Sequence, residues 1–245
     1  MSGHSKWSNI KRKKEANDKV KGLVFSKLSR LLTLTVVESG GITDLENNIK
    51  LRLAVDKAKQ SNMPKEIIQR AINKGVGSDR SQIKEYIFEA FAPSGVGLII
   101  ISASDNHNRT TSEVRNILEQ HEGKLGNQGS VSYLFTKCGL VTFNKRMNQE
   151  DVVYKFADNI NSIDIDEDEA LFFVYIPFEN IGKVKNQLYG SIPETVEVDY
   201  KPNALIKVIN ESQIKKILSL IEALESLEDI QKVYANFDIA DQYLK

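Results

Sequence analysis

The sequence predicts an α+β protein of three domains, an N-terminal helical bundle followed by two small α/β domains. Each α/β domain is expected to hold a ferredoxin-like sheet with helices on one face, and the third domain is expected to be inserted in the second. Apolar residues follow a helical period up to residue 76 and alternate as in strands from about residue 82. The segment after residue 202 is too short to form a domain of its own.

Three helices are predicted before residue 80. Residues 23–37 carry apolar side chains three and four positions apart, which is typical of a buried helix face, and Gly40 ends that helix. Thr43 and Glu46 have the spacing of a capping box, so the second helix is expected to begin there. Residues 64–75 form the third, because proline is favoured at the start of a helix and glycine just after its end.

The second domain begins where the apolar period changes. Alternation in residues 82–91 predicts one strand, and the apolar residues 96–101 predict another. Thr110 with Glu113 predicts the cap of a helix, and a further strand is expected at residues 131–135. Three strands and one helix leave this sheet incomplete.

A second α/β unit follows, with the order of a β-α-β-β-α-β-like run. Its strands are predicted at residues 140–143, 171–176 and 196–200, and its helices at residues 150–160 and 179–189. This acidic unit is expected to fold as a separate domain.

The last part of the chain predicts a strand at residues 204–208, a helix at residues 212–224 and a strand at residues 230–235. These elements are expected to complete the sheet of the second domain, so the unit between them is an insertion. The predicted domains are residues 1–80, residues 81–136 with 203–245, and residues 137–202.

The formal net charge of zero hides an uneven distribution. Residues 1–80 hold 17 lysines and arginines against 8 aspartates and glutamates, whereas residues 81–245 hold 16 against 25. The first 30 residues alone carry 9 basic and 2 acidic side chains. Such a concentration of positive charge is typical of a chain that contacts an anionic partner.

The basic stretch from Lys6 to Lys21 includes the single tryptophan, Trp7. Lysine and arginine gain affinity for phosphates by releasing counterions, and an aromatic ring stacks on an unpaired base, so the stretch is expected to bind nucleic acid. Two alternatives stay open: a solvated tail, and a Trp7 that packs on the helical bundle. The expected nucleic-acid-binding residues are His4, Lys6, Trp7, Asn9, Lys11, Arg12, Lys13, Lys14, Lys19, Lys21, Lys27 and Arg30.

The bundle has no clear helix-turn-helix signature with a polar recognition face. The expected contacts therefore position the protein on nucleic acid more than they recognise a base sequence.

No metal or cofactor is expected. The single cysteine, Cys138, excludes an internal disulfide and a cysteine-based zinc site. The run from Asp164 to Asp168 resembles the start of a calcium loop, but Glu169 stands where glycine is required and Tyr175 where an acidic ligand is required. The run is expected to be a solvated edge.

The candidates for catalysis are weak. The glycines between residues 123 and 129 precede a predicted strand instead of opening a helix, so they are expected to form turns and not a phosphate loop. His107 shares a loop with Asp105 and Arg109, either as a catalytic cluster or, since no nucleophile accompanies it, in loop formation and helix capping. Neither an enzymatic activity nor a small-molecule substrate is expected.

A cytoplasmic location without a membrane partner is expected. The longest apolar run, residues 96–101, is far shorter than a membrane span. The N-terminus is polar and basic and lacks the apolar core of a secretory signal.

Several stretches, in order and spacing along nearly the whole chain, resemble the YebC/PmpR family. One departure is Ala92-Pro93-Ser94-Gly95, where the family usually has Gly-Pro-Gly-Gly. The matching stretches are Gly3-His4-Ser5-Lys6-Trp7, Asn62-Met63-Pro64-Lys65, Asp105-Asn106-His107-Asn108-Arg109-Thr110, Gly129-Ser130-Val131-Ser132-Tyr133-Leu134-Phe135 and Val233-Tyr234-Ala235-Asn236-Phe237.

The resemblance implies three domains, with the third inserted in the second, and a DNA-binding regulator of transcription in the cytoplasm. The family also includes mitochondrial translational activators. They imply the alternative of a ribosome-associated translation factor that binds rRNA or tRNA and relieves stalled peptide synthesis. The choice between DNA and RNA and the oligomeric state stay open.

Overall fold

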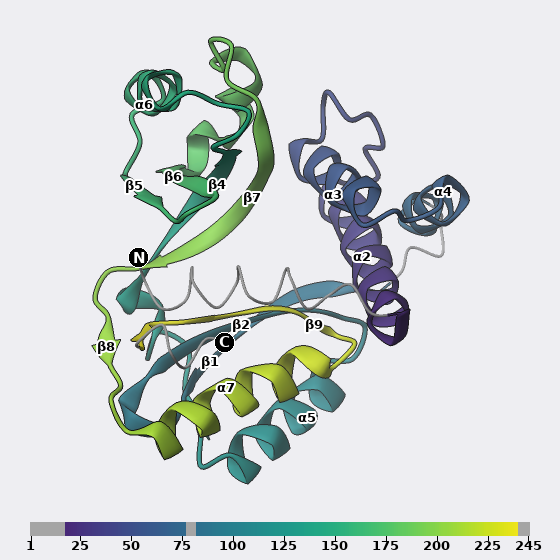
Figure 1. Ribbon diagram of the computed structural model, residues 1–245. Coiled ribbons are helices and arrows are strands. Elements are labelled where there is room, and N and C mark those ends of the chain that lie inside the picture. Colours follow the sequence, from purple (N-terminus) through teal and green to yellow (C-terminus); the bar gives the residue numbers. More distant parts are fainter. Residues whose placement is uncertain (1–17, 77–81, 240–245) are drawn as a thin grey trace. The chain divides into compact units, whose positions relative to one another are not determined.

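The computed structural model describes residues 18–76 and 82–239 of the chain (Figure 1). Residues 135–203 form one compact unit, here called the inserted unit, and the remaining described residues form the main unit. The fold is α+β with small antiparallel sheets, as predicted. The finer division of the main unit into a helical and a sheet domain stays a prediction.

The helical part of the main unit, residues 18–76, consists of α2 (Asp18–Glu38), α3 (Ile49–Gln60) and α4 (Lys65–Lys74). The three helices share one apolar core because each turns a stripe of aliphatic side chains towards the others. Its buried members are Leu28, Leu32, Val36, Leu51, Ala54, Val55, Ala58, Met63, Ile68, Ala71 and Ile72.

The predicted capping box at Thr43 and Glu46 is wrong, because α3 begins six residues after Thr43 and its N-cap is Asn48. The buried Asn48 side chain accepts a hydrogen bond from the Leu51 N–H at 3.0 Å. Its amide nitrogen donates to the carbonyl oxygens of Thr35 at 3.2 Å and Ile42 at 3.0 Å. One side chain thus caps α3 and ties it to the end of α2.

The sheet of the main unit has the order β3-β1-β2-β9 and is antiparallel throughout. Strand β9, from the end of the chain, pairs with β2, so the C-terminal segment completes this sheet as predicted. Helices α5 (His107–Gln120) and α7 (Glu211–Ser226) cover one face of it (Figure 1). The strands are β1 (Lys84–Phe91), β2 (Gly97–Ser104), β3 (Lys124–Leu125) and β9 (Ile230–Ala235), and a short 3-10 helix, η1 (Pro93–Gly95), joins β1 to β2.

Apolar side chains between the sheet and its two helices form the largest core of the chain. Leu98 and Ile100 of β2 face Val114 and Leu118 of α5, and all four are fully buried. Two further short strands, β8 (Ile206–Lys207) and β10 (Phe237–Asp238), form a separate parallel pair. The strand predicted at residues 204–208 is thus shorter in the structure, where only β8 forms within that range.

Two local predictions in the main unit are wrong. The cap of α5 is Asn106, whose side chain accepts from the Arg109 N–H at 3.0 Å, and Thr110 lies inside the helix. The strand predicted at residues 131–135 is instead a 3-10 helix, η2 (Ser132–Leu134), that leads into β4.

The inserted unit holds a second antiparallel sheet, in the order β5-β6-β4-β7. Phe156 of α6 packs edge-on against Phe143 of β4 with ring centroids 5.1 Å apart. The helix predicted at residues 179–189 is a 3-10 helix, η3, that approaches β4 at Gly139, where an added Cβ would lie 2.5 Å from Ile181. The elements are β4 (Phe135–Asn144), α6 (Glu150–Asn159), β5 (Asp164–Glu167), β6 (Leu171–Pro177), η3 (Phe178–Asn186) and β7 (Pro193–Pro202).

Candidate nucleic-acid interface

Most of the predicted nucleic-acid-binding residues lie outside the described part of the chain. This holds for His4, Lys6, Trp7, Asn9, Lys11, Arg12, Lys13 and Lys14, and for the side chain of Lys19. Of the others, Lys21 is exposed near the start of α2, whereas Lys27 and Arg30 are half-buried in the same helix. The structure therefore defines where the basic segment, residues 1–21, joins the fold: at the N-terminal end of α2.

Helix α2 is held by apolar contacts on two sides. Leu32 and Val36 belong to the core of the helical part. Leu34 packs with Ile83 and Ala103, which belong to the sheet part of the main unit. An apolar run that faces two cores is typical of an internal helix, and it places α2 against the sheet.

Polar contacts hold the middle of α2 to the end of α7 and to the turn before β9. The Ser26 hydroxyl donates to the Glu228 carboxylate. Lys27 Nζ donates to the carbonyl oxygen of Glu225 at 2.6 Å. Arg30 pairs with Glu228 at 3.3 Å and with Asp229 at 3.0 Å. As nucleic-acid contacts, Lys27 and Arg30 stay predictions, since in this structure both bind oxygen atoms of the chain itself.

Asp229 is the centre of a buried polar cluster. Its carboxylate accepts hydrogen bonds from Ser104 Oγ at 2.9 Å, Thr110 Oγ1 at 2.7 Å and Arg109 Nη2 at 2.7 Å, in addition to the pair with Arg30. Burial acts to raise the pKa of Asp229, but the hydrogen bonds from Arg109, Thr110 and Ser104 outweigh it, so its pKa lies below the ordinary value. The carboxylate is thus held ionised.

The loop from Asp105 to Arg109, for which a catalytic cluster was one interpretation, takes part in this cluster. Arg109 also pairs with Asp105 at 2.9 Å, and the hydrogen bonds to Asp229 and Asp105 raise the pKa of Arg109. The His107 ring packs on the rings of Tyr86 and Phe88, with ring centroids 4.6 Å and 5.7 Å apart. These contacts favour the interpretation as loop formation and helix capping over a catalytic one.

The glycine-containing loop after α5 binds an anion of the chain itself. The buried Glu89 carboxylate accepts from the backbone N–H groups of Gly129 at 2.7 Å, Val131 at 2.5 Å and Ser132 at 2.8 Å. Burial acts to raise the pKa of Glu89, and these three hydrogen bonds outweigh it and lower the pKa. The N–H groups that would hold a phosphate in a phosphate loop are therefore occupied by Glu89.

The surface of α3 and α4 carries cations that were not among the predicted site residues. Residues 18–76 hold 11 lysines and arginines against 6 aspartates and glutamates, whereas the inserted unit holds 7 against 12. The relevant signal in the sequence is their position between the apolar residues of each helix, which turns them outward. The exposed cations are Lys50, Lys57 and Lys59 of α3 and Lys65, Arg70 and Lys74 of α4.

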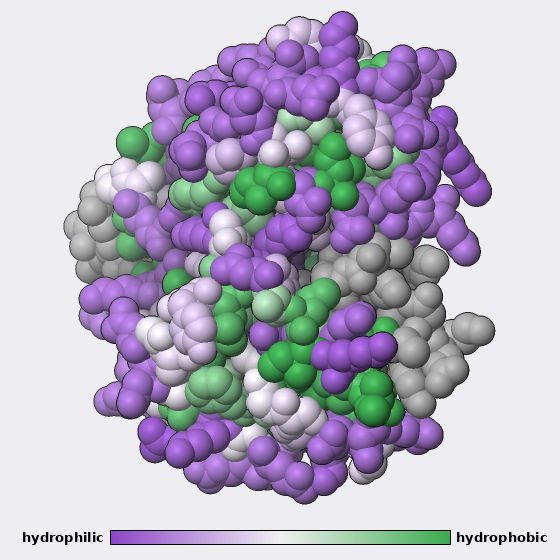
Figure 2. Space-filling view, turned by 90° about the vertical axis from the view of Figure 1, so that its left-hand side faces the viewer, coloured by the Kyte–Doolittle hydropathy of each residue, from purple (hydrophilic) through white to green (hydrophobic). Residues whose placement is uncertain are grey.

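Within residues 18–76 and 82–239, no group of three or more histidine, cysteine, aspartate or glutamate side chains could hold a metal ion. No helix in those ranges is long and apolar enough to cross a membrane. On the face shown in Figure 2, hydrophilic residues predominate and apolar residues form smaller patches between them.

Comparison with known proteins gives matches over almost the whole chain. A family model described as the TACO1/YebC protein N-terminal domain matches residues 5–78, and one described as the TACO1/YebC second and third domain matches residues 83–237. A protein of Borrelia turicatae named "Probable transcriptional regulatory protein" is 42% identical over 245 residues, which cover 99% of each chain. A protein of the same name from Halothermothrix orenii is 38% identical over 250 residues, covering 100% of this chain and 98% of that one.

A solved structure is similar in fold as well as in sequence. It is the crystal structure of a conserved hypothetical protein from Aquifex aeolicus, with a TM-score of 0.83 and 36% identity. The match covers 91% of this chain and 92% of that one.

Proposed function

Because the chain belongs to the TACO1/YebC family, we propose that it is a nucleic-acid-binding regulator of transcription. In this proposal it acts in the cytoplasm, holds DNA by contacts to phosphates and has no enzymatic activity. The names of the relatives from Borrelia turicatae and Halothermothrix orenii, which describe transcriptional regulators, support the proposal.

The observation that carries the proposal is the concentration of positive charge at one end of the chain. The first 30 residues hold 9 basic side chains against 2 acidic ones, and α3 and α4 add exposed cations to the surface next in sequence. Each lysine or arginine that neutralises a phosphate releases counterions, which supplies most of the affinity of a contact without base recognition. The twelve residues expected from the sequence, from His4 to Arg30, remain the proposed contacts.

The acidic inserted unit is not expected to contact DNA. Its 12 acidic side chains against 7 basic ones repel phosphates, so it keeps DNA on the helical part. It is also free to supply a surface for another protein.

Crosslinking tests which nucleic acid the chain holds. The full chain is expressed with an affinity tag, crosslinked in cells and recovered, and the bound nucleic acid is sequenced. We expect DNA fragments that share genomic positions, and a loss of most of this material when Lys11, Arg12, Lys13 and Lys14 are changed to glutamine.

The translation-factor alternative gives a different result in the same experiment. Recovery of rRNA or tRNA in place of DNA, together with sedimentation of the chain with ribosomes in a sucrose gradient, would contradict the proposal. The alternative uses the same lysines and Trp7, so the identity of the recovered nucleic acid separates the two functions.

A further inference from the structure

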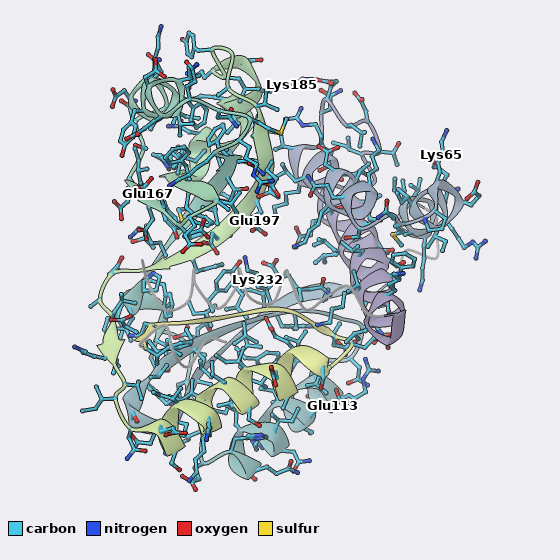
Figure 3. The ribbon with its side chains drawn as sticks, in the orientation of Figure 1. Lys65, Glu113, Glu167, Lys185, Glu197 and Lys232 are labelled. Atoms are coloured by element: carbon cyan, nitrogen blue, oxygen red, sulfur yellow. The ribbon has the colours of Figure 1, made fainter. Side chains whose placement is uncertain are left out.

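Helix α4 turns a polar, cationic face outward. Its inward residues Ile68, Ala71 and Ile72 are buried, whereas the residues between them are exposed. On the exposed face, Lys65, Gln69 and Asn73 follow one another at intervals of four. Arg70 and Lys74 lie beside them, and the exposed Glu66 lies on the same face, one turn before Arg70. In Figure 3, Lys65 is labelled on α4. The first and last residues of the helix, Lys65 and Lys74, are cations. Between them the outward face carries two amides, Gln69 and Asn73, and the guanidinium of Arg70.

The helix is firmly seated, so its outward face has a defined direction. The Thr33 hydroxyl of α2 donates to the Ala71 carbonyl oxygen at 2.9 Å. Gly75, the C-cap of α4, lies so close to α2 that an added Cβ would be 2.7 Å from the Cβ of Val36. The turn before α4 holds Asn62 in the left-handed conformation, with φ of 56°, and buries Met63 in the core.

The amides at the centre of the face are already oriented. Gln69 Nε2 donates to Asn73 Oδ1 at 3.0 Å, which directs the Gln69 carbonyl oxygen and the Asn73 amide nitrogen to other partners. Asparagine and glutamine form paired hydrogen bonds with the edge of adenine, and arginine does so with guanine. A face that carries Gln69, Arg70 and Asn73 has the donors and acceptors needed to distinguish base pairs.

The charge and length of this face fit a groove of duplex DNA. Within the described residues, Lys65, Arg70 and Lys74 take part in no ion pair, and the single acidic residue of α4, Glu66, lies in the first turn, where the helix dipole favours it. A helix of 10 residues is about 15 Å long. The major groove of B-form DNA is about 12 Å wide and admits such a helix, whereas the major groove of A-form RNA is too narrow.

We propose that α4 is a recognition helix that enters the major groove of duplex DNA, where Gln69, Arg70 and Asn73 contact base edges and Lys65 and Lys74 contact phosphates. The inference rests on the proposed function and adds sequence recognition to it. It departs from the sequence-based expectation of contacts that only position the protein, because the five outward side chains of α4 include two amides and an arginine that are able to contact base edges.

Selection from a pool of random duplexes tests the proposal with the full chain. The native chain is expected to enrich a short motif. The variant Gln69→Ala, Arg70→Ala, Asn73→Ala is expected to bind the enriched duplex at least about a hundredfold more weakly, since each lost base contact weakens binding by about fivefold or more. Its affinity for a scrambled duplex is expected to change by less than about threefold.

Helix α5 offers a matched control. It carries an exposed Arg115 and an amide pair of the same kind, in which Gln120 Nε2 donates to Asn116 Oδ1 at 3.3 Å. Changing Arg115, Asn116 and Gln120 to alanine removes the same side chains from another exposed helix and is expected to leave the motif and the affinity unchanged. The variant Arg70→Lys keeps the charge and loses the paired hydrogen bonds, so it is expected to relax the motif while it preserves salt dependence.

Three outcomes overturn the inference. An unchanged motif in the α4 variant would show that another element contacts the bases and would leave the proposed function intact. Tight duplex binding by the native chain without any enriched motif would show that the chain does not recognise a base sequence, and it would also leave the proposed function intact. No duplex binding by the native chain would remove the proposed function together with the inference.

Discussion

Arg30 of α2 and Asp229, the residue before β9, lie 3.0 Å apart and join the helical part of the main unit to its sheet. The Asp229 side chain is 4% exposed and also binds Arg109, Thr110 and Ser104. Helix α2, whose first four residues are the last four of the basic segment, is thereby anchored to the end of β2, the start of α5 and the start of β9.

Substitution of Asp229 is expected to destabilise the main unit. Asp229→Ala leaves two arginines and two hydroxyls without their shared acceptor, so the free energy of unfolding in urea should fall by about 2–4 kcal/mol. Glu228→Gln is the control: its side chain is 56% exposed and pairs with the same Arg30, so a loss below about 1 kcal/mol is expected. Equal losses in the free energy of unfolding of the two variants would contradict the conclusion that the contacts of Asp229 stabilise the main unit more than those of Glu228.

Asp229 is also expected to contribute to the loss of stability at acidic pH. The pKa of Asp229 is lower in the folded than in the unfolded chain, so its contribution to stability is complete above the ordinary pKa of an aspartate and is lost as the pH falls through the folded value. Urea titrations between pH 7 and pH 3 are therefore expected to show a steeper fall in stability below pH 4 for the native chain than for Asp229→Asn. Parallel curves would mean that Asp229 titrates alike in both states.

Glu89 is expected to hold the loop that contains Gly129. Glu89→Gln replaces a carboxylate, whose two oxygens accept hydrogen bonds from three backbone N–H groups, with a neutral amide that has one acceptor oxygen. We therefore expect a loss of about 1–3 kcal/mol in the free energy of unfolding. Hydrogen exchange of the amides of Gly129, Val131 and Ser132 should accelerate selectively. Glu85→Gln, an exposed change on the same strand, should leave that exchange unaltered.

Asn48 is expected to matter more than Thr43 for the start of α3. Asn48→Ala removes the cap and leaves the Thr35 and Ile42 carbonyl oxygens without their donor, which corresponds to a loss of about 1–3 kcal/mol. Thr43→Ala should change the free energy of unfolding by less than about 0.5 kcal/mol. A larger loss for Thr43→Ala than for Asn48→Ala in thermal or urea unfolding would contradict this assignment and favour the capping box predicted from the sequence.

The sequence predicts the helices and strands well where the signal is local. Apolar spacing within four residues predicted α4, α6 and α7 to within two positions, and it predicted α2 from residue 23 although the helix begins at Asp18. The strands β1 and β9 were also predicted, β1 from its alternation. The starts of α3 and α5 were predicted wrongly because several nearby side chains were able to cap the N-terminus of each helix. Tertiary contacts determine which of them does so. For Asn48 these partners are the carbonyl oxygens of Thr35 and Ile42.

Contacts between distant parts of the chain account for the remaining differences. A strand was predicted at residues 131–135, yet the N–H groups of Val131 and Ser132 donate to the Glu89 carboxylate instead of to a neighbouring strand. The cluster at Asp229 joins residues more than a hundred positions apart, such as Ser104, and no spacing in the sequence reveals it. The outward face of α4 was within reach of the sequence, since it follows from the helical period.

The central claim is that the basic segment binds phosphates of DNA. The most direct measurement is the affinity of the full chain for a labelled duplex, followed by fluorescence anisotropy between 50 and 200 mM salt. Changing Lys11, Arg12, Lys13 and Lys14 to glutamine should weaken binding and reduce the slope of log K against log salt by about 3–4, roughly 0.9 for each phosphate contact. The control variant changes Lys124, Lys155, Lys183 and Lys207, exposed lysines outside the helical part, to glutamine and should keep the native slope. A native slope in the first variant would contradict the claim.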